Sequence, residues 1–319
     1  MNKFFRALIL LGASIVVSSA HSSWERNIDH IFLDSFADGA MTISAPDMVH
    51  VLWAYSARSR PGADLQGFDV SGNVIYLIDL AAQPYAAATV RTITKIQESS
   101  SILAWGGGTL LKVSRNGGLL WRIEDRLITD DVIDAYEYAD GSTAVALASR
   151  GDVNLHTSLM RISPTGKVID LRRISGAYGS ARARFDRNGR VMVLRDQFVL
   201  SRFDGRTMEE TAHWSRIEAN TRAIEAARDG GAVVLTSEAI VRIASNGDIL
   251  WRTPFATPFT SSATEVRLIE TASGNWLVYE IEYEQHVTGI SPSGSINFSR
   301  PSNRAESSTL SEDGSVFVS

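Results

Sequence analysis

The chain has 319 residues, of which 44% are hydrophobic, with a formal net charge of -5 and no cysteine. This is enough apolar material for a sizeable core, and all-β folds of this size are commonly one domain. The lack of cysteine excludes disulfides, thiolate metal sites and thiol nucleophiles. The mild acidity argues against a general nucleic-acid binder.

Residues 1–20 have the pattern of a secretory signal peptide. Lys3 and Arg6 precede the apolar run Ala7–Val17, and small residues at positions 18–20 form a cleavage site. The run is short for a membrane span, so a retained anchor is the weaker alternative. Cleavage after Ala20 would remove two cations and take the net charge from -5 to -7. We therefore expect residues 21–319 to form one exported domain, periplasmic or secreted, with no membrane span.

Tight-turn signals occur in pairs, most clearly within residues 221–252. Asp229-Gly230 separates two short apolar runs, and Asn246-Gly247 separates the next two. Such dipeptides accept the positive φ angles of a short β-hairpin turn. Four consecutive antiparallel strands with short links form a meander, which is the blade of a β-propeller.

Two series of turn glycines alternate along the chain. The later turn of each unit contains Gly72, Gly117, Gly166, Gly205, Gly247 or Gly294, and the earlier turn contains Gly39, Gly141, Gly189, Gly230, Gly274 or Gly314. Glu98–Ser101 supplies the earlier turn that lacks glycine. A period in the mid-forties predicts an all-β propeller of about seven four-stranded blades, with six or eight as alternatives. The same phase predicts strands in Ala212–Arg228, where the apolar spacing also fits a helix.

Two parts of the chain interrupt this regular spacing of turns. Ala45–Gln66 reads as an insertion in the first unit, and long insertions between blade strands form loops that often bind ligands. The seventh unit begins near Ala305 and stops at Ser319 with half a blade. Either Trp24–Leu33 returns to complete this blade, or the chain is C-terminally truncated. Ten residues are few for two strands and a turn, which favours truncation and an incompletely closed ring.

Residues 110–124, LLKVSRNGGLLWRIE, and 240–255, IVRIASNGDILWRTPF, resemble the repeats of the quinoprotein-type, or PQQ-like, β-propellers. In those repeats a polar residue and a turn ending in glycine separate two apolar strands, the second of which ends in Trp. Trp121 and Trp251 occupy that position here, and Leu80, Leu171 and Phe298 lie near it in other units. The resemblance implies a propeller fold.

The quinoprotein dehydrogenases of this class bind a quinone beside calcium, and many contain a vicinal disulfide. This sequence has no cysteine and no matching cluster of calcium ligands. The resemblance therefore implies the non-enzymatic branch, with no cofactor. That branch includes an outer-membrane-assembly scaffold lipoprotein, whose lipidated cysteine this chain lacks.

Three sets of residues are candidate sites. The six histidines, His21, His30, His50, His156, His213 and His286, have no zinc-motif spacing and read as surface or edge residues. Asp130, Asp131, Asp134 and Glu137 read as a solvated turn before a strand rather than as calcium ligands. Arg172, Arg173, Arg182, Arg184, Arg187 and Arg190 could receive an anionic partner, or could be ordinary exposed arginines.

Shorter motifs carry less weight. Arg150-Gly151-Asp152 spells an adhesion tripeptide, which occurs often by chance, and there is no Gly-x-Ser-x-Gly motif of a serine hydrolase. Gly106-Gly107-Gly108 reads as a turn between strands, because the Lys-Ser/Thr pair of a phosphate loop does not follow it. Large aromatic rings fill the wedge between blades, so we predict core positions for Trp53, Trp105, Trp121, Trp251 and Trp276.

No catalytic set, metal site or cofactor site emerges from these residues. The sequence favours an exported binding or scaffold module for a protein or another extracellular ligand. The candidate partner-binding residues are Trp53, Tyr55, Arg172, Arg173, Arg182 and Arg184. One alternative is a quinoprotein-like or other propeller enzyme with a central polar site, and another is a propeller segment of a larger surface protein. The oligomeric state is not predicted.

Overall fold

The protein is described by a computed structural model. It describes residues 13–18, 23–28, 37–45, 48–57, 60–69, 73–87, 89–124, 131–148, 156–174, 183–195, 199–215, 221–236, 238–255, 265–271, 273–281, 286–301, 308–310 and 316–318. The regular elements within these ranges are β-strands. The described residues contain no helix that is long and apolar enough to cross a membrane. The predicted all-β class is confirmed.

Six sheets each contain four antiparallel strands in sequence order. The first two sheets are β3 (Ala37–Ala45), β4 (Met48–Ala57), β5 (Arg60–Asp69), β6 (Val74–Asp79), and β7 (Thr92–Lys95), β8 (Ile102–Gly106), β9 (Thr109–Val113), β10 (Leu119–Glu124). The next two are β11 (Asp131–Glu137), β12 (Thr143–Ala148), β13 (Thr157–Ile162), β14 (Val168–Ile174), and β15 (Ala183–Phe185), β16 (Arg190–Arg195), β17 (Val199–Asp204), β18 (Glu210–Ser215). The last two are β19 (Thr221–Ala226), β20 (Ala232–Thr236), β21 (Ala239–Ile243), β22 (Ile249–Pro254), and β23 (Glu265–Glu270), β24 (Trp276–Ile281), β25 (His286–Ile290), β26 (Ile296–Pro301).

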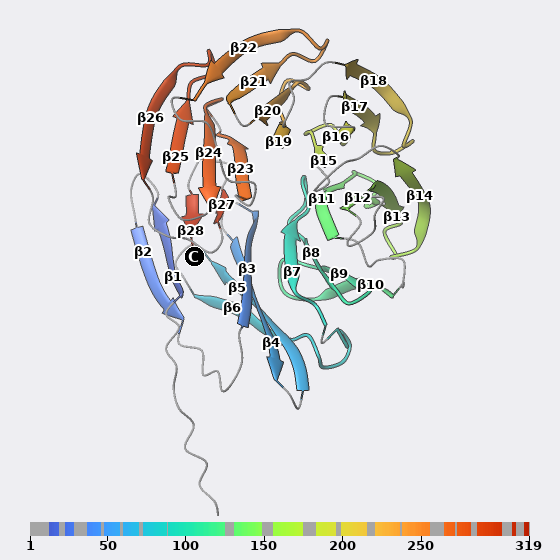
Figure 1. Cartoon of the computed structure of the whole chain (residues 1–319). Coiled ribbons are helices and arrows are strands. Elements are labelled where there is room, and N and C mark those ends of the chain that lie inside the picture. Colours follow the sequence, from blue (N-terminus) through green and yellow to red (C-terminus); the bar gives the residue numbers. More distant parts are fainter. Residues whose placement is uncertain are drawn as a thin grey trace, which may run out of the picture.

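The sheets are arranged as blades around a central axis (Figure 1). The first strand of each blade is the innermost, and it lies beside the first strand of the next blade from β3 through β7, β11, β15 and β19 to β23. The fourth strand forms the outer rim. We number these six blades 1 to 6 in chain order. The architecture is a β-propeller.

Two hairpins occupy the place of a seventh blade. They are β1 (Ala13–Ser18) with β2 (Ser23–Ile28), and β27 (Ser308–Leu310) with β28 (Val316–Val318). β1 lies beside β28, and β27 lies beside β3, so strands from both ends of the sequence meet there. The sequence analysis considered Trp24–Leu33 for this role, but the two strands begin earlier, at Ala13. Since β1 falls within the predicted signal peptide, cleavage after Ala20 would remove it. That cleavage stays a prediction.

The turn pattern of the sequence is largely confirmed. Glycines of both series have positive φ, including Gly141 at 79° and Gly166 at 84° within blade 3. Glu98 adopts a φ of 57° in the turn without glycine. In the later turn of blade 4, Met208 has the left-handed conformation, with a φ of 58°. Ala212–Arg228 contains β18 and β19, as the repeat phase predicts.

Blade 1 contradicts the sequence analysis in two respects. Gly39 was expected in a turn but lies inside β3, opposite Trp53 of β4. Ala45–Gln66 was expected to be an inserted loop, but it contains all of β4 and most of β5, which pair in register from Met48↔Asp69 to Ala57↔Arg60. The reason is burial, because Met48–Leu52 is a continuous run of buried side chains, as in a strand that is covered on both faces.

His50 lies within that buried run, so its assignment as a surface or edge residue was wrong. Its Nδ1 atom is hydrogen-bonded to the hydroxyl of Tyr76 on β6. Burial is the largest cause that lowers the pKa of His50 to about 3, with a smaller contribution from Arg115. The imidazole is therefore neutral at physiological pH and serves as a polar core residue.

Consecutive blades are joined by an aromatic ring that packs on a turn glycine. The rings lie on the outer strands: Tyr76 on β6, Trp121 on β10, Trp214 on β18 and Trp251 on β22. Each faces the later turn of another blade, at Gly117, Gly166, Gly247 and Gly294 respectively. A Cβ atom on Gly166 would lie 2.6 Å from Cβ of Trp121, so only glycine fits. Trp251 also donates from Nε1 to the carbonyl of Pro292 at 2.9 Å.

The predicted tryptophan positions agree with this packing where side chains are described. Trp105 and Trp121 belong to the hydrophobic cluster between blades 2 and 3. Trp276 is 2% exposed and packs, together with Trp251, in the cluster between blades 5 and 6. The side chain of Trp53 lies outside the described residues.

We predict that Gly166→Ala destabilises the ring more than Gly274→Ala does. Both glycines are in the left-handed region, with φ of 84° and 78°, so both variants incur a backbone cost of about 1–2 kcal/mol. At Gly274 the nearest atom to an added Cβ is 3.6 Å away, whereas at Gly166 it is Trp121 Cβ at 2.6 Å. The overlap should cost roughly 1–3 kcal/mol more. Equal decreases in the thermal unfolding midpoint would contradict the proposed contact.

Candidate functional site

The inner wall of the ring carries a chain of charged side chains. Asp134 lies on β11, Arg184 on β15, Glu225 on β19 and Glu270 on β23, which are the innermost strands of blades 3 to 6. Since these strands are neighbours around the axis, residues that are far apart in sequence come together here.

Asp134 joins three blades. Its Oδ2 atom accepts hydrogen bonds from Gln97 Nε2 at 2.9 Å and from the Phe185 amide at 2.8 Å, and its Oδ1 atom accepts one from the Ala135 amide. Gln97 also donates to the Phe185 carbonyl at 3.0 Å. Burial raises the pKa of Asp134, although Arg184 and these hydrogen bonds act in the opposite direction.

Arg184 connects the walls of blades 4 and 5. Its Nε atom is 3.2 Å from Oε2 of Glu225, and its guanidinium also donates to the Ala183 carbonyl at 2.9 Å. Burial raises the pKa of Glu225 to about 8, and the negative charges of Asp134 and Glu270 act in the same direction, whereas Arg184 opposes them. The carboxyl group of Glu225 therefore has a pKa well above that of an ordinary glutamate.

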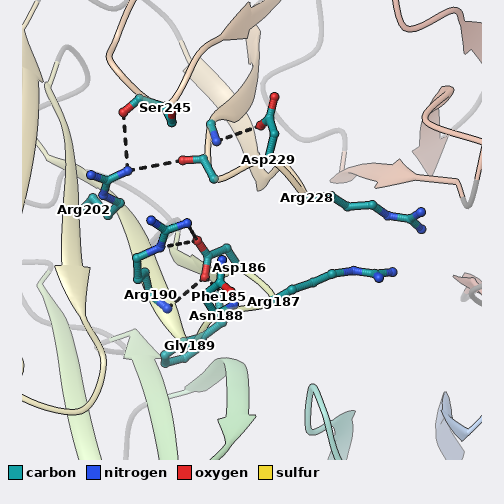
Figure 2. A network of polar contacts seen from close by, with 12 residues as sticks. Phe185, Asp186, Arg187, Asn188, Gly189, Arg190, Arg202, Arg228, Asp229 and Ser245 are labelled. Carbon is teal, nitrogen blue, oxygen red and sulfur yellow. Dashed lines mark hydrogen bonds and ion pairs between the residues drawn. The ribbon is translucent and has the colours of Figure 1, made fainter.

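The turns that follow β15 and β19 each contain an arginine. Arg187 and Arg228 each stand two residues before the turn glycine, Gly189 or Gly230. Figure 2 shows their side chains extending away from the two turns in a similar direction. The backbone amide of Arg228 donates to Oε2 of Glu270 at 2.9 Å, which links this turn to blade 6.

The acidic run of the sequence is not a solvated turn. Its described part, Asp131–Glu137, is strand β11, with Asp134 buried in the wall. Glu137 instead pairs with the buried Lys112 of blade 2, with Oε1 2.7 Å from Nζ. That expectation was wrong because a strand at the axis can satisfy carboxylates with polar groups from neighbouring blades, which local sequence does not reveal.

The arginines that are close together in the sequence are separated in the structure, between an outer strand and an innermost strand. Arg172 and Arg173 lie on β14, an outer strand, where Arg172 donates to the Met208 carbonyl at 2.7 Å and lies over the Phe203 ring. Arg184 is on an innermost strand, and Arg182 lies outside the described residues. Arg190 pairs with Asp186 at 2.6 Å. The described arginines of this set therefore do not lie on a single strand or turn.

The remaining candidates are placed as follows. Trp53 and Tyr55 are in β4, and their side chains are outside the described residues, as are His21, His30 and the tripeptide at 150–152. Gly106-Gly107-Gly108 forms the end of β8 and the turn to β9, as predicted. Among the side chains that the structure describes, no group of three or more His, Asp or Glu is arranged to hold a metal ion.

Sequence reasoning missed Glu225, Glu270 and Arg228. A signal was nevertheless present, since Arg184 and Glu225 each stand five residues before an early-turn glycine. Equal repeat phase implies equal position on the innermost strand of consecutive blades. Comparing such phase-matched residues across units would have paired this cation with this carboxylate.

These features define a β-propeller with a charged inner wall. Comparisons with known proteins support the fold. BamB from Moraxella catarrhalis is similar in structure, with a TM-score of 0.54 and 13% identity, covering 96% of this chain and 88% of BamB. A protein of unknown function from Bacteroides caccae matches with a TM-score of 0.47 and 10% identity, over 80% of this chain and 94% of that one. No protein-family model and no curated protein sequence matches the chain.

We predict that Glu225→Gln reduces the pH dependence of stability between about pH 5 and 8. The folded state keeps the Glu225 proton up to about pH 8, whereas an ordinary glutamate loses it near 4.5. Its contribution to the free energy of unfolding is thus complete below the lower value and lost as pH rises through the higher one. Thermal unfolding midpoints across this range should fall less steeply with rising pH in the variant.

The exposed Glu209 on the outer part of blade 4 provides the control. Glu209→Gln should keep the wild-type slope. If Glu225→Gln also keeps that slope, the raised pKa of Glu225 is refuted.

Proposed function

We propose that this chain is an exported binding or scaffold module that holds a protein partner on a rigid propeller. The observation that carries the proposal is the β4–β5 hairpin of blade 1. Each of its strands has ten residues, the longest among the described strands. Strand β6 pairs with β5 only from Asp64 onward, so residues 60–63 extend beyond that ladder. In Figure 1 the hairpin reaches outward past the neighbouring blade.

The distal half of this hairpin contains the aromatic residues that the sequence nominated. Trp53 is opposite Asp64 and Tyr55 is opposite Gly62 in the β4–β5 register. Trp and Tyr are enriched at the centres of protein interfaces, where they contribute large contact area with few rotatable bonds. We therefore place the partner site at this hairpin. Since Arg172 and Arg173 lie on a different blade from Arg184, these arginines are not included as one contact surface.

The exported location is supported by the N-terminal pattern alone. Lys3, Arg6 and the apolar run Ala7–Val17 are typical of a cleaved secretory signal. The similarity to BamB supports the fold and is compatible with a non-enzymatic propeller. The mass of the mature protein, recovered from the periplasm or the medium, tests both export and cleavage after Ala20.

We predict that the double variant Trp53→Ala with Tyr55→Ala captures less partner than the wild type. The tagged full-length protein would be incubated with an envelope extract, and the captured proteins quantified by mass spectrometry. Loss of two interface aromatics should reduce capture of a specific partner roughly tenfold or more. The control is Ile249→Ala with Leu250→Ala, which alters two exposed apolar side chains on β22 of blade 5. Equal recovery by both double variants would place the partner site elsewhere.

An enzyme with a central polar site is the second candidate, and one observation favours it. Glu225 has a pKa of about 8 beside Arg184 on the inner wall, and perturbed carboxyl groups are frequent at catalytic sites. Calcium and quinone analysis of the protein purified from its own source separates the two functions. Stoichiometric calcium or quinone would favour the enzyme over the binding module.

A further inference from the structure

The most exposed large hydrophobic side chains in the described part of the chain lie on outer strands of the blades. They are found on β6, β10, β14, β22 and β26. β6 carries three of them, since Val74, Ile75 and Leu77 are 49%, 42% and 59% exposed. Blade 1 ends at β6, which pairs with β5 alone among the described strands. This edge strand therefore presents apolar side chains beside backbone groups that no described strand pairs.

The other outer strands that expose hydrophobic residues carry features that protect an edge. Charged residues and proline on an edge strand discourage pairing with another chain. β10 contains Arg122, and β14 contains Asp170 and Arg172. β22 and β26 end in proline, at Pro254 and Pro301.

β6 has neither kind of protection within its length. Its sequence is VIYLID, in which the one charged residue, Asp79, is the last. A β-bulge can also protect an edge. However, a register shift between the third and the outer strand recurs in all six blades, so it does not distinguish β6 from the others. The edge of blade 1 is thus the least protected among these outer strands.

The residues of β6 match a copy of the same strand. In an antiparallel pair that is centred on Tyr76, Ile75 lies opposite Leu77 of the copy, and Val74 lies opposite Ile78. Every apolar residue of the strand then faces an apolar residue. Such cross-strand pairs are the contacts that stabilise a sheet.

The charge of the strand is also compatible with this pairing. Asp79 of one copy lies opposite Asn73 of the other, which is uncharged, so like charges do not face each other directly. A dimer with two-fold symmetry uses the same surface on both subunits, which requires a surface that is complementary to itself. β6 meets this requirement through both its apolar residues and its charge.

We infer that the outer edge of β6 binds the same edge of a second copy of this chain, so that the two blade 1 sheets form one continuous antiparallel sheet. The contact is closed, because each copy uses its single β6 edge. This inference goes beyond the proposed binding function and does not depend on it, since it requires no other protein.

Sedimentation of the purified protein over a range of concentrations tests this inference. We expect a reversible equilibrium between monomer and dimer. Leu77→Lys should raise the dissociation constant roughly tenfold or more, because it places a charge within the strand pair. The matched control is Leu250→Lys on β22, where the leucine is similarly exposed, at 56%. It should keep the wild-type dissociation constant within about twofold.

Introduced cysteines give a second measurement, because the chain contains none of its own. Ile75→Cys with Leu77→Cys places the thiols of one copy opposite those of the other, so mild oxidation should yield a disulfide-linked dimer. The control is Ile249→Cys with Leu250→Cys on β22, which should stay monomeric. Thermal unfolding establishes that each variant is folded.

A wild type that is monomeric at every concentration would overturn the inference. Equal weakening of the dimer by Leu77→Lys and Leu250→Lys, or equal cross-linking of the two double variants, would also overturn it. Capture of a partner at the β4–β5 hairpin is measured separately, with Trp53→Ala and Tyr55→Ala. The two proposals can therefore fail independently.

Discussion

The ring depends on the contact between an outer-strand aromatic and the turn glycine of another blade. An isolated four-stranded sheet has two faces to bury, and it buries them only against its neighbours. Trp121 against Gly166 and Trp251 against Gly294 fix the spacing of these neighbours at the rim. The contact explains why the repeat combines two features that are far apart in sequence, a terminal aromatic and a turn without a side chain.

A second constraint acts through cations on the third strands of blades 2 and 4. Lys112 is bonded to Glu137 and Thr143 of blade 3, while Arg202 donates to carbonyls in two turns of blade 5. These groups are buried or partly buried and so require partners. The polar connections are directional, and they set the angle between sheets whose apolar contacts alone would permit sliding. Together the two constraints hold neighbouring blades against one another.

The sequence predicted the positions of the strands better than the contacts of their side chains. Turn glycines with a fixed period are local signals, and they located the blades and most strands correctly. Blade 1 was misinterpreted because Asp38-Gly39 imitates a turn while the flanking residues continue a strand. The inner wall was missed for another reason. Asp134 is satisfied by Gln97 and Phe185, which come from blades 2 and 4, and such partners are defined only once the ring closes.

The contact of β27 with β3 has a consequence for how the molecule forms. These strands are separated by almost the entire sequence, so their encounter carries the largest loop-closure entropy in the fold. Blades 1 to 6 need only segments adjacent in sequence, and each can assemble as soon as it is synthesised. The ring is closed only afterwards, by non-covalent contacts between these strands. A nascent chain would therefore first form an open arc of blades, and a mechanically stretched chain would open to the same arc. In both cases the unpaired strand edges are exposed where the ring closes.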